Sequence, residues 1–239
     1  MSIYEKKLRL RSSDVDMHRR LRTSTLFALL QEAAIAHTEQ LGMGREKTLD
    51  KGALWIVTLQ AAQIRRMPEY DEDVVLRSWP GQTMHVLFPR YCALNSADGE
   101  PLVRASALWT LIDSKSRKLV FPERLGVEIQ GVSLPEDEIP LPRASRAVPF
   151  TAERDFTVPY SYVDLNGHMN NTRYFDLAED CIPAAAEGRA LRAVNVEFAR
   201  EVRFGEELHL RWGQEGARWY ITGSGETDAF RMSFTYEEA

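Results

Sequence analysis

The 239-residue sequence has few cysteines, no excess of positive charge and no long hydrophobic run. Its two cysteines, Cys92 and Cys181, lie far apart and form neither a C-x-x-C motif nor a metal-ligand spacing. We expect both to pack as small apolar residues in a reducing compartment. The net charge of −5 supplies no basic field for nucleic acid. No apolar run reaches the length of a membrane-spanning helix, and residues 1–7 lack the apolar core of a signal peptide. These absences predict a soluble, cytoplasmic protein with no nucleic-acid partner and no membrane span.

The sequence does contain enough apolar material for a full core. Hydrophobic residues make up 44% of the chain and charged residues 27%, as in ordinary globular proteins. A length of 239 residues fits either one large domain or two of ordinary size. The domain organisation therefore has to be inferred from patterns along the chain.

One stretch concentrates polar side chains that can carry chemistry. It reads Asp164-Leu165-Asn166-Gly167-His168-Met169-Asn170-Asn171-Thr172. Asn and Gly favour a tight turn, Asn and Thr are types that cap helix N-termini, and apolar residues from Tyr174 to Ala185 follow at helical spacing. The stretch predicts a strand, a tight turn and a helix start, with a carboxylate, an amide and an imidazole held at the turn. Free backbone N–H groups at such a helix start can stabilise an oxyanion.

A similar pattern occurs earlier in the chain. Residues 15–20 (Val-Asp-Met-His-Arg-Arg) align with residues 163–168 (Val-Asp-Leu-Asn-Gly-His) at an offset of 148 (164 − 16), and a helical pattern follows each. Residues 63–77 align with residues 197–211 at an offset of 134 (197 − 63), so the first copy carries about 14 extra residues after its turn. Repetition of a whole unit is strong evidence of architecture. The chain is therefore predicted to contain two tandem copies of one unit.

Each copy continues as a series of strands separated by turn residues. The patterns predict strands at 3–11, 55–65, 73–79, 84–94, 102–113 and 118–121 in the first copy, and at 193–203, 207–212, 218–223 and 230–236 in the second. A helix followed by an antiparallel meander, twice over, is an α+β arrangement. Residues 133–149 contain four prolines among charged residues, which is typical of a linker.

The motif Asp-x-Asn-x-His-x-Asn-Asn before a helix resembles the active-site motif of hot-dog-fold thioesterases, and most closely that of the acyl-ACP thioesterase family. The resemblance covers essentially the whole chain. It implies a tandem (double) hot-dog fold, each half an antiparallel sheet wrapped around a long central helix. The implied domains are an N-terminal hot-dog at 1–132 with a degenerate site and the acyl-chain tunnel, a linker at 133–149, and a catalytic C-terminal hot-dog at 150–239. The implied reaction is the fatty-acid-releasing hydrolysis of acyl-acyl carrier protein, with the acyl-phosphopantetheine-bearing carrier as partner and no cofactor.

Comparison of the two copies predicts that the second one does the chemistry. Where the second copy has Asn166 and His168, the first has His18 and Arg20. The first copy keeps an aspartate but replaces the amide by an imidazole and the imidazole by a guanidinium. We therefore expect one active site per chain, in the C-terminal half, and a tunnel shaped by the N-terminal half.

Glu201 is a further candidate, because it matches the Glu of a second motif that this family carries and is replaced by Met67 in the first copy. The Cys that follows this Glu in plant members is Val202 here, which excludes a Cys–His nucleophile at this position. Trp55 is assigned to substrate contact, although its apolar strand is also typical of a core position. We predict catalytic residues Asp164, Asn166, His168 and Glu201, substrate-binding residues Asn170, Asn171 and Trp55, and no metal site.

Several alternatives stay open at this point. Either Asp164 or Glu201 is the base that activates water, while the other orients His168. The carrier is acyl carrier protein or, as the runner-up, coenzyme A; a third reading is a non-catalytic acyl-binding hot-dog protein. Acyl chain length is not predicted, and the fused chain is compatible with a monomer or a homodimer.

Overall fold

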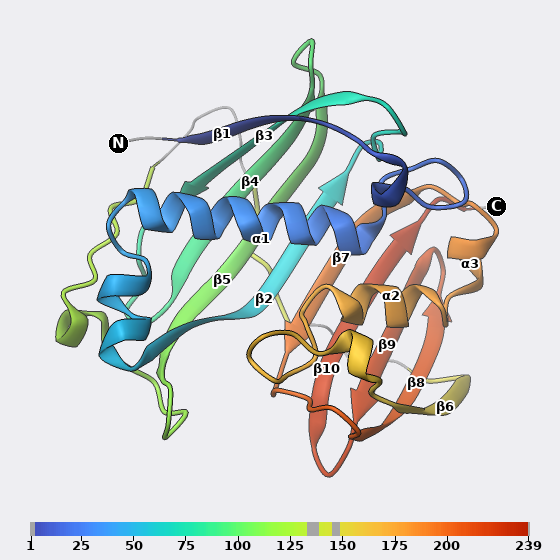
Figure 1. Ribbon diagram of the computed structural model, residues 1–239. Coiled ribbons are helices and arrows are strands. Elements are labelled where there is room, and N and C mark those ends of the chain that lie inside the picture. Colours follow the sequence, from blue (N-terminus) through green and yellow to red (C-terminus); the bar gives the residue numbers. More distant parts are fainter. Residues whose placement is uncertain (1–2, 133–138, 145–148, 239) are drawn as a thin grey trace.

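In the computed structural model, which describes residues 3–132, 139–144 and 149–238, ten described strands form a single sheet with the helices on one face (Figure 1). The strands are β1 (Tyr4–Arg9), β2 (Ala53–Ile64), β3 (Asp73–Pro80), β4 (Phe88–Ser96), β5 (Pro101–Asp113), β6 (Ala152–Thr157), β7 (Leu191–Phe198), β8 (Glu207–Glu215), β9 (Arg218–Ser224) and β10 (Asp228–Tyr236). Their order across the sheet is β1-β3-β4-β5-β2-β7-β10-β9-β8-β6, and all neighbouring strands are antiparallel. The predicted strand at 118–121 appears only as a bridge between Ile112 and Leu119.

Equivalent strands of the two copies come in the same order from opposite edges of the sheet. The order β1-β3-β4-β5-β2 from one edge corresponds to β6-β8-β9-β10-β7 from the other. The two copies meet where β2 pairs with β7, and Ala61 lies opposite Asn195. These two positions are also 134 residues apart, the offset that the sequence repeat gives for this part of the chain. A pseudo-two-fold axis therefore passes between them, as expected if each copy pairs through the same patch.

The two copies differ in their helices. Helix α1 (Thr23–Gln40) lies across the strands of the first copy and buries one face, whereas α2 (Arg173–Glu179) is much shorter and is followed by α3 (Pro183–Ala186) (Figure 1). The helical spacing that runs to Ala185 in the sequence is interrupted because Pro183 has no N–H to donate within a helix. It instead begins α3, where a missing N–H costs nothing.

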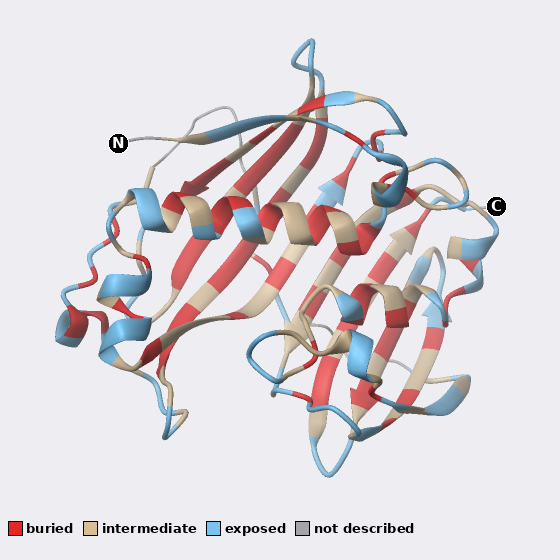
Figure 2. Cartoon of the chain, in the orientation of Figure 1, coloured by how far each residue is buried: buried red, intermediate tan, exposed pale blue. Residues whose placement is uncertain are grey.

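One continuous core joins the two copies. Buried residues occur in the strands and helices of both copies (Figure 2), and Phe27 of α1 stacks on Phe175 of α2 with ring centroids 4.1 Å apart. Both rings are buried, so this contact fixes the two helices relative to each other. The shared sheet and this helix contact therefore fix the positions of the turns that precede α1 and α2 relative to each other.

The predicted linker at 133–149 lies largely outside the described residues. Within residues 139–144, the carbonyl of Pro140 accepts a hydrogen bond from Ser106, and the carbonyl of Arg143 accepts one from Asn195. This part of the segment therefore lies against strands of both copies. None of the helices in the described ranges is long and apolar enough to cross a bilayer.

Candidate active site

The turn that begins at Asp164 is organised by that residue's own side chain. Asp164 Oδ1 accepts the backbone N–H of Asn166 at 2.8 Å, and the Asp164 N–H donates to the His168 carbonyl at 3.0 Å. Gly167 has a φ of +78°, a conformation that strains any residue with a side chain. The Asp-x-Asn-Gly sequence therefore closes the turn. The Asn166 side chain is exposed at its tip.

The turn brings His168 next to Glu201, which comes from the loop between β7 and β8. Met169 donates its N–H to the Val202 carbonyl at 2.7 Å, and His168 forms a β-bridge with Arg203. This pairing places Nε2 of His168 3.2 Å from Oε2 of Glu201. The second carboxylate oxygen of Glu201 accepts a hydrogen bond from the Arg117 guanidinium. The structure thus brings together two of the four predicted catalytic residues through their side chains.

The environment of His168 favours the neutral imidazole. Burial lowers the pKa of this histidine, the positive charges of Arg117 and Arg203 lower it further, and Asp164 acts weakly in the opposite direction. A neutral ring carries one N–H donor and one acceptor nitrogen. With Nε2–H facing the Glu201 carboxylate, Nδ1 is the nitrogen that can take a proton.

The two asparagines that follow the turn have different surroundings. Asn170 donates its amide to Asp164 Oδ2 at 3.3 Å, while its Oδ1 accepts the N–H of Thr172 at 2.9 Å, so it ties the turn to the start of α2. Asn171 instead reaches the other copy, where its amide donates to Oε1 of Gln31 on α1 at 3.4 Å. The N–H groups of Thr172 and Arg173, at the start of α2, thus both donate to Asn170.

Trp55 lies apart from these residues, in the wall of an apolar cavity of about 230 Å³ between α1 and the sheet of the first copy. Its indole packs edge-on against Phe88, with centroids 4.7 Å apart. A narrower cavity of only about 10 Å³ adjoins it, sharing Ala34, Arg90 and Trp109, and is lined by Gln31. Neither of these two cavities is lined by Asp164, His168 or Glu201. The Asn171–Gln31 contact is what links them to the turn.

Two residues of this arrangement were not predicted from the sequence. Gln31 could have been found, since the 148-residue offset pairs it with Glu179 and so marks a polar position inside a helix that otherwise packs on a sheet. Arg117 carries no such signal, because it lies in the turn after β5 between Lys115 and Lys118, and basic residues in a turn are common. The predicted residue Glu201 pairs through its side chain with both Arg117 and His168.

Comparison with known families agrees with this architecture. A family model described as the acyl-ACP thioesterase N-terminal domain matches residues 1–123, and one described as the acyl-ACP thioesterase C-terminal domain matches residues 147–233. The chain belongs to the acyl-ACP thioesterase family. The family predicted from the motif is therefore confirmed.

Members of this family with curated names align over most of the chain. It is 26% identical to the chloroplastic palmitoyl-acyl carrier protein thioesterase of Gossypium hirsutum, over 83% of this chain and 52% of that protein. It is 24% identical to the chloroplastic dodecanoyl-[acyl-carrier-protein] hydrolase of Cinnamomum camphora, over 83% of this chain and 56% of that protein. The chain thus spans about half the length of these relatives.

Solved structures of the acyl-ACP thioesterase family share the fold over nearly the whole chain. An acyl-ACP thioesterase from Bacteroides thetaiotaomicron superposes with a TM-score of 0.83 at 21% identity, covering 98% of both chains. The 12:0-ACP thioesterase from Umbellularia californica gives 0.81 at 19% identity, covering 98% of this chain and 97% of the other. The predicted double hot-dog fold is confirmed.

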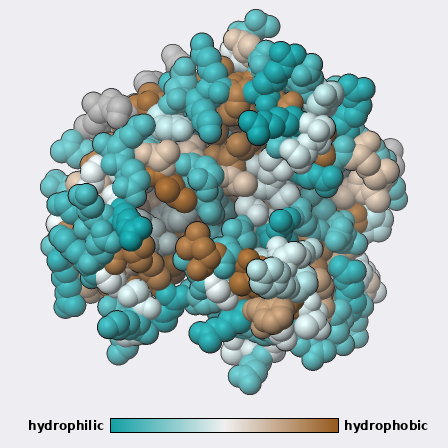
Figure 3. All heavy atoms as spheres, viewed as in Figure 1, coloured by the Kyte–Doolittle hydropathy of each residue, from teal (hydrophilic) through white to brown (hydrophobic). Residues whose placement is uncertain are grey.

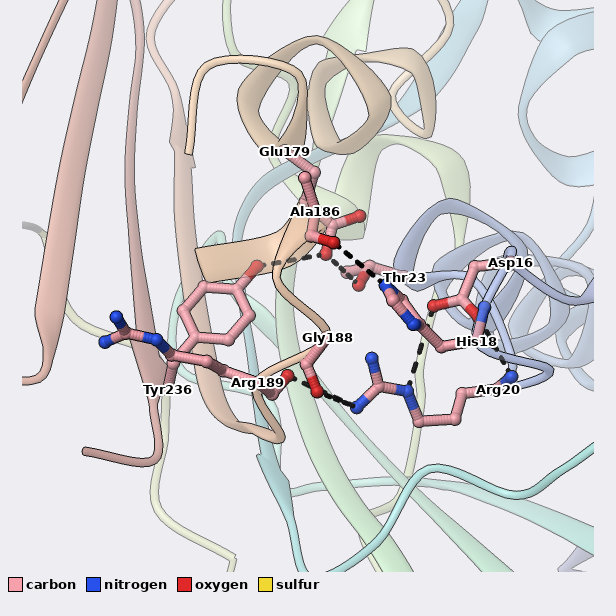
Figure 4. A network of polar contacts seen from close by, with 9 residues as sticks. All are labelled: Asp16, His18, Arg20, Thr23, Glu179, Ala186, Gly188, Arg189 and Tyr236. Carbon is pink, nitrogen blue, oxygen red and sulfur yellow. Dashed lines mark hydrogen bonds and ion pairs between the residues drawn. The ribbon is translucent and has the colours of Figure 1, made fainter. Parts of the chain in front are cut away.

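In this acyl-ACP thioesterase family member, the first copy's turn contains a different polar network (Figure 4). Asp16 Oδ1 accepts the N–H groups of His18 and Arg20 at 2.8 and 2.9 Å. The Arg20 guanidinium donates to the carbonyls of Gly188 and Arg189, and His18 Nε2 lies 3.1 Å from the Ala186 carbonyl. The side chains that replace the amide and the imidazole are thus bonded to the backbone after α3.

A carboxyl group lies at the centre of that network. Glu179 Oε1 accepts hydrogen bonds from Thr23 Oγ1 at 2.7 Å and from the Tyr236 hydroxyl at 3.3 Å (Figure 4). Loss of hydration raises the pKa of Glu179 to about 7, even though both hydroxyl contacts lower it. It borders a cavity of about 770 Å³ that lies beside the first copy's turn. The first copy therefore retains a cavity and polar side chains, arranged without an imidazole–carboxylate pair.

Proposed function

We propose that the chain hydrolyses the thioester of acyl-acyl carrier protein and releases a free fatty acid. The observation that carries the proposal is the contact between His168 and Glu201 at a turn that Asn171 links, through Gln31, to an apolar cavity in the other copy. An imidazole–carboxylate pair that a side-chain contact connects to an apolar cavity is what hydrolysis of an acyl thioester requires. The relatives' names support the same substrate class.

The reaction that we propose begins with the acyl chain in the cavity lined by Trp55. The amides of Asn166 and Asn171 donate to the carbonyl oxygen as it becomes an oxyanion. His168 Nδ1 takes a proton from water, whose oxygen attacks the carbonyl carbon, and the Glu201 carboxylate stabilises the imidazolium that forms. The carbon–sulfur bond then breaks, and His168 returns the proton to the leaving thiolate. The products are the carboxylic acid and the carrier's free thiol.

This proposal gives Asp164 and Glu201 separate roles. Glu201 faces His168, so it is the carboxylate that acts with the imidazole. Asp164 uses its oxygens to hold Asn166 and Asn170, so it positions the turn. The two halves have separate roles as well: we propose that residues 1–132 form the acyl tunnel and residues 150–239 carry the chemistry.

Exposed apolar residues near the turn support a protein carrier. Leu165 at the tip of the turn is 97% exposed, and the exposed rings of Tyr160 and Phe204 pack edge-on with centroids 6.5 Å apart. Hydrophobic side chains also gather near the middle of the face seen in Figure 3. Clustered exposed apolar residues mark protein contacts. A carrier protein bearing acyl-phosphopantetheine in the cytoplasm would bury them, whereas coenzyme A is too small to do so.

The test is to measure kcat/KM for one acyl chain attached to acyl carrier protein and to coenzyme A, following release of free thiol. We expect the carrier-protein substrate to be preferred. A preference for the coenzyme A substrate would mean that coenzyme A, and not acyl carrier protein, is the carrier. Absence of turnover of both substrates would favour a non-catalytic acyl-binding protein. A panel of chain lengths, assayed with wild type and with Asp164→Ala, His168→Ala and Glu201→Ala, then ties any activity to this turn.

A further inference from the structure

The wall of the apolar cavity contains a buried cation. Arg90 of β4 is only 5% exposed and borders both the cavity lined by Trp55 and the narrower one lined by Gln31. Its guanidinium donates to Nδ1 of His37 at 2.9 Å and to Oγ1 of Thr38 at 2.8 Å, both on α1. An imidazole nitrogen that accepts a hydrogen bond belongs to a neutral ring. The acceptors that these bonds give Arg90 therefore carry no negative charge.

This arrangement leaves a positive charge without a counter-charge. Burial lowers the pKa of Arg90 to about 10, so the group is still a cation at neutral pH. No ion pair joins it to a carboxylate in the residues that the structure describes. Buried charges are ordinarily paired, because desolvating an unpaired ion is costly. The two hydrogen bonds also use fewer than half of the donors that a guanidinium carries.

A second donor in the same wall lacks an acceptor. Trp109 Nε1 is buried and has no hydrogen-bond partner among the described residues, and Trp109 borders both cavities. The neighbouring indole of Trp55, in contrast, donates to the Met43 carbonyl at 3.2 Å. An apolar chain alone would leave the N–H of Trp109 without an acceptor, which is unfavourable for a buried donor.

In the second copy, the side-chain donor at the position equivalent to Trp109 has a hydrogen-bond acceptor. Trp109 pairs with Val57 and Tyr236 pairs with Leu191, and Val57 and Leu191 are 134 residues apart, so Trp109 and Tyr236 occupy equivalent positions. Tyr236 donates to the carboxyl group of Glu179. The residue equivalent to Glu179 is Gln31, which instead pairs with Asn171. Among the residues that the structure describes, the N–H of Trp109 therefore has no equivalent acceptor.

We propose that this cavity selects acyl chains that carry an oxygen acceptor, best a terminal carboxylate, at the depth of Arg90. The inference rests on the proposed function, in which the chain occupies this cavity. Arg90 is bonded at Thr38, seven residues beyond Gln31 on α1, so the oxygen belongs about 10 Å further along the chain than the Gln31 end. An oxygen at this depth meets a cation that forms no ion pair with a carboxylate among the described residues. The carboxylate of Glu39, which also borders the cavity, instead accepts the N–H of Arg45.

The first test compares wild-type kcat/KM for carrier-bound fatty acyl chains with that for the matching mono-thioesters of dicarboxylic acids and ω-hydroxy acids. The length of the chain is varied through a series. We expect an oxygenated chain to be preferred by about ten- to a hundredfold where its oxygen reaches Arg90, with the preference falling away for shorter and longer members. Equal rates, or faster turnover of the plain chain at every length, would overturn the inference while leaving the thioesterase proposal intact.

Variants assign the preference to the wall. Arg90→Met, and separately Trp109→Phe, should bring the ratio of oxygenated to plain substrate towards one, whereas Arg124→Met, which removes an exposed arginine outside the cavity, should keep the wild-type ratio. A preference that survives both wall variants would contradict the inference.

Calorimetry of wild type with free dicarboxylic and fatty acids of equal length gives a readout that needs no catalysis. Tighter binding of the dicarboxylic acid is expected, and weaker or equal binding counts against the inference. If wild type shows this binding but hydrolyses no thioester, the proposed function fails and the binding site stands.

Discussion

The two turns of this molecule share a backbone and differ in what their side chains contact. In the first, the Asp16 N–H donates to the Arg20 carbonyl, and in the second the Asp164 N–H donates to that of His168. In each, the aspartate also accepts N–H groups of the turn. The aspartate is therefore a structural requirement of the turn in both copies. The fifth residue of the turn, counted from the aspartate, differs between the copies: it is Arg20 in the first and His168 in the second.

What lies opposite that position decides whether the turn can do chemistry. His168 faces the carboxylate of Glu201, while the first copy has buried Met67 at the equivalent place. Arg20 donates instead to two backbone carbonyls of the segment after α3. The first copy thus uses its polar side chains to stabilise the fold. The second copy has an imidazole, that of His168, with a nitrogen able to accept a proton.

The largest expected effect separates the two histidines. His168→Ala should lower kcat/KM by about 10²–10⁴-fold, because general acid–base catalysis is worth this much. The matched change His18→Ala, which removes only a contact to the Ala186 carbonyl, should stay within a few-fold of wild type. Steady-state hydrolysis of one acyl-carrier substrate measures both. Comparable losses for the two variants, with both folded by circular dichroism, would contradict the assignment of the chemistry to the second copy.

The next largest effect concerns the free energy of unfolding. It compares Glu179 with Gln31, the residue at the equivalent position of the first copy. The ordinary pKa of a glutamate is 4.5 and that of folded Glu179 is about 7. Between these values the folded state binds more protons than the unfolded state, so the free energy of unfolding falls as pH rises from about 4.5 to 7. The loss amounts to about 3 kcal/mol. Glu179→Gln, which makes this position match Gln31, should remove that decline and be the more stable protein above pH 7.

Urea unfolding of wild type and Glu179→Gln at several pH values between 4 and 8 checks this expectation. Gln31→Glu provides the converse, since it places a carboxyl group at the equivalent position of the other copy and should introduce a new loss of stability on raising the pH. An unchanged pH slope in Glu179→Gln would show that Glu179 is better hydrated than its surroundings indicate.

A smaller effect tests the aspartates that the two turns share. Asp16→Asn and Asp164→Asn each weaken charge-assisted hydrogen bonds to turn N–H groups, so each should lower the free energy of unfolding by about 1–2 kcal/mol. Only Asp164→Asn should also lower kcat, because it alone positions the turn that carries His168. Thermal or urea denaturation combined with kcat distinguishes the two consequences. A loss of kcat in Asp16→Asn alone would mean that the first copy's turn, and not the second's, positions the catalytic residues.

The sequence repeat predicted most of the fold because the same pattern appears twice. The strand predicted at 55–65 matches β2 closely, whereas the one predicted at 193–203 overlaps β7 but extends five residues (203 − 198) beyond its end at Phe198. Their shared offset locates the pair that meets at the pseudo-two-fold axis. The length of the second helix was harder, since apolar spacing continues past Cys181 although Pro183 ends the hydrogen-bonding pattern. Helical periodicity reports which face is apolar and does not report where the backbone breaks.

Residue spacing predicted only the local part of the candidate site, and Glu201 was added by its match to the second motif of the family. Asp164, Asn166 and His168 lie within one turn, so their spacing placed them together. The contact of His168 with Glu201 depends on a strand bridge, and that of Glu201 with Arg117 on a turn of the other copy, 84 residues away. Trp55 was assigned to substrate, and it lies in a cavity wall on the first copy's side of the molecule. Long-range contacts of single charged residues leave no periodic signal in a sequence.

The smallest expected effect concerns Arg117, a residue through which the first copy acts on the second copy's site. Its charge lowers the pKa of His168 and its guanidinium holds Glu201. Arg117→Gln should therefore raise the pKa of His168 and move the acidic limb of the kcat/KM profile to higher pH, with the partial exposure of the pair limiting the shift. Because the reaction needs the neutral imidazole, activity near pH 6 falls by a larger factor than activity near pH 8. Arg124→Gln, an exposed arginine outside the site, serves as control and should leave the profile in place. A profile that keeps its acidic limb in Arg117→Gln would mean that the imidazole titrates independently of the first copy's charge.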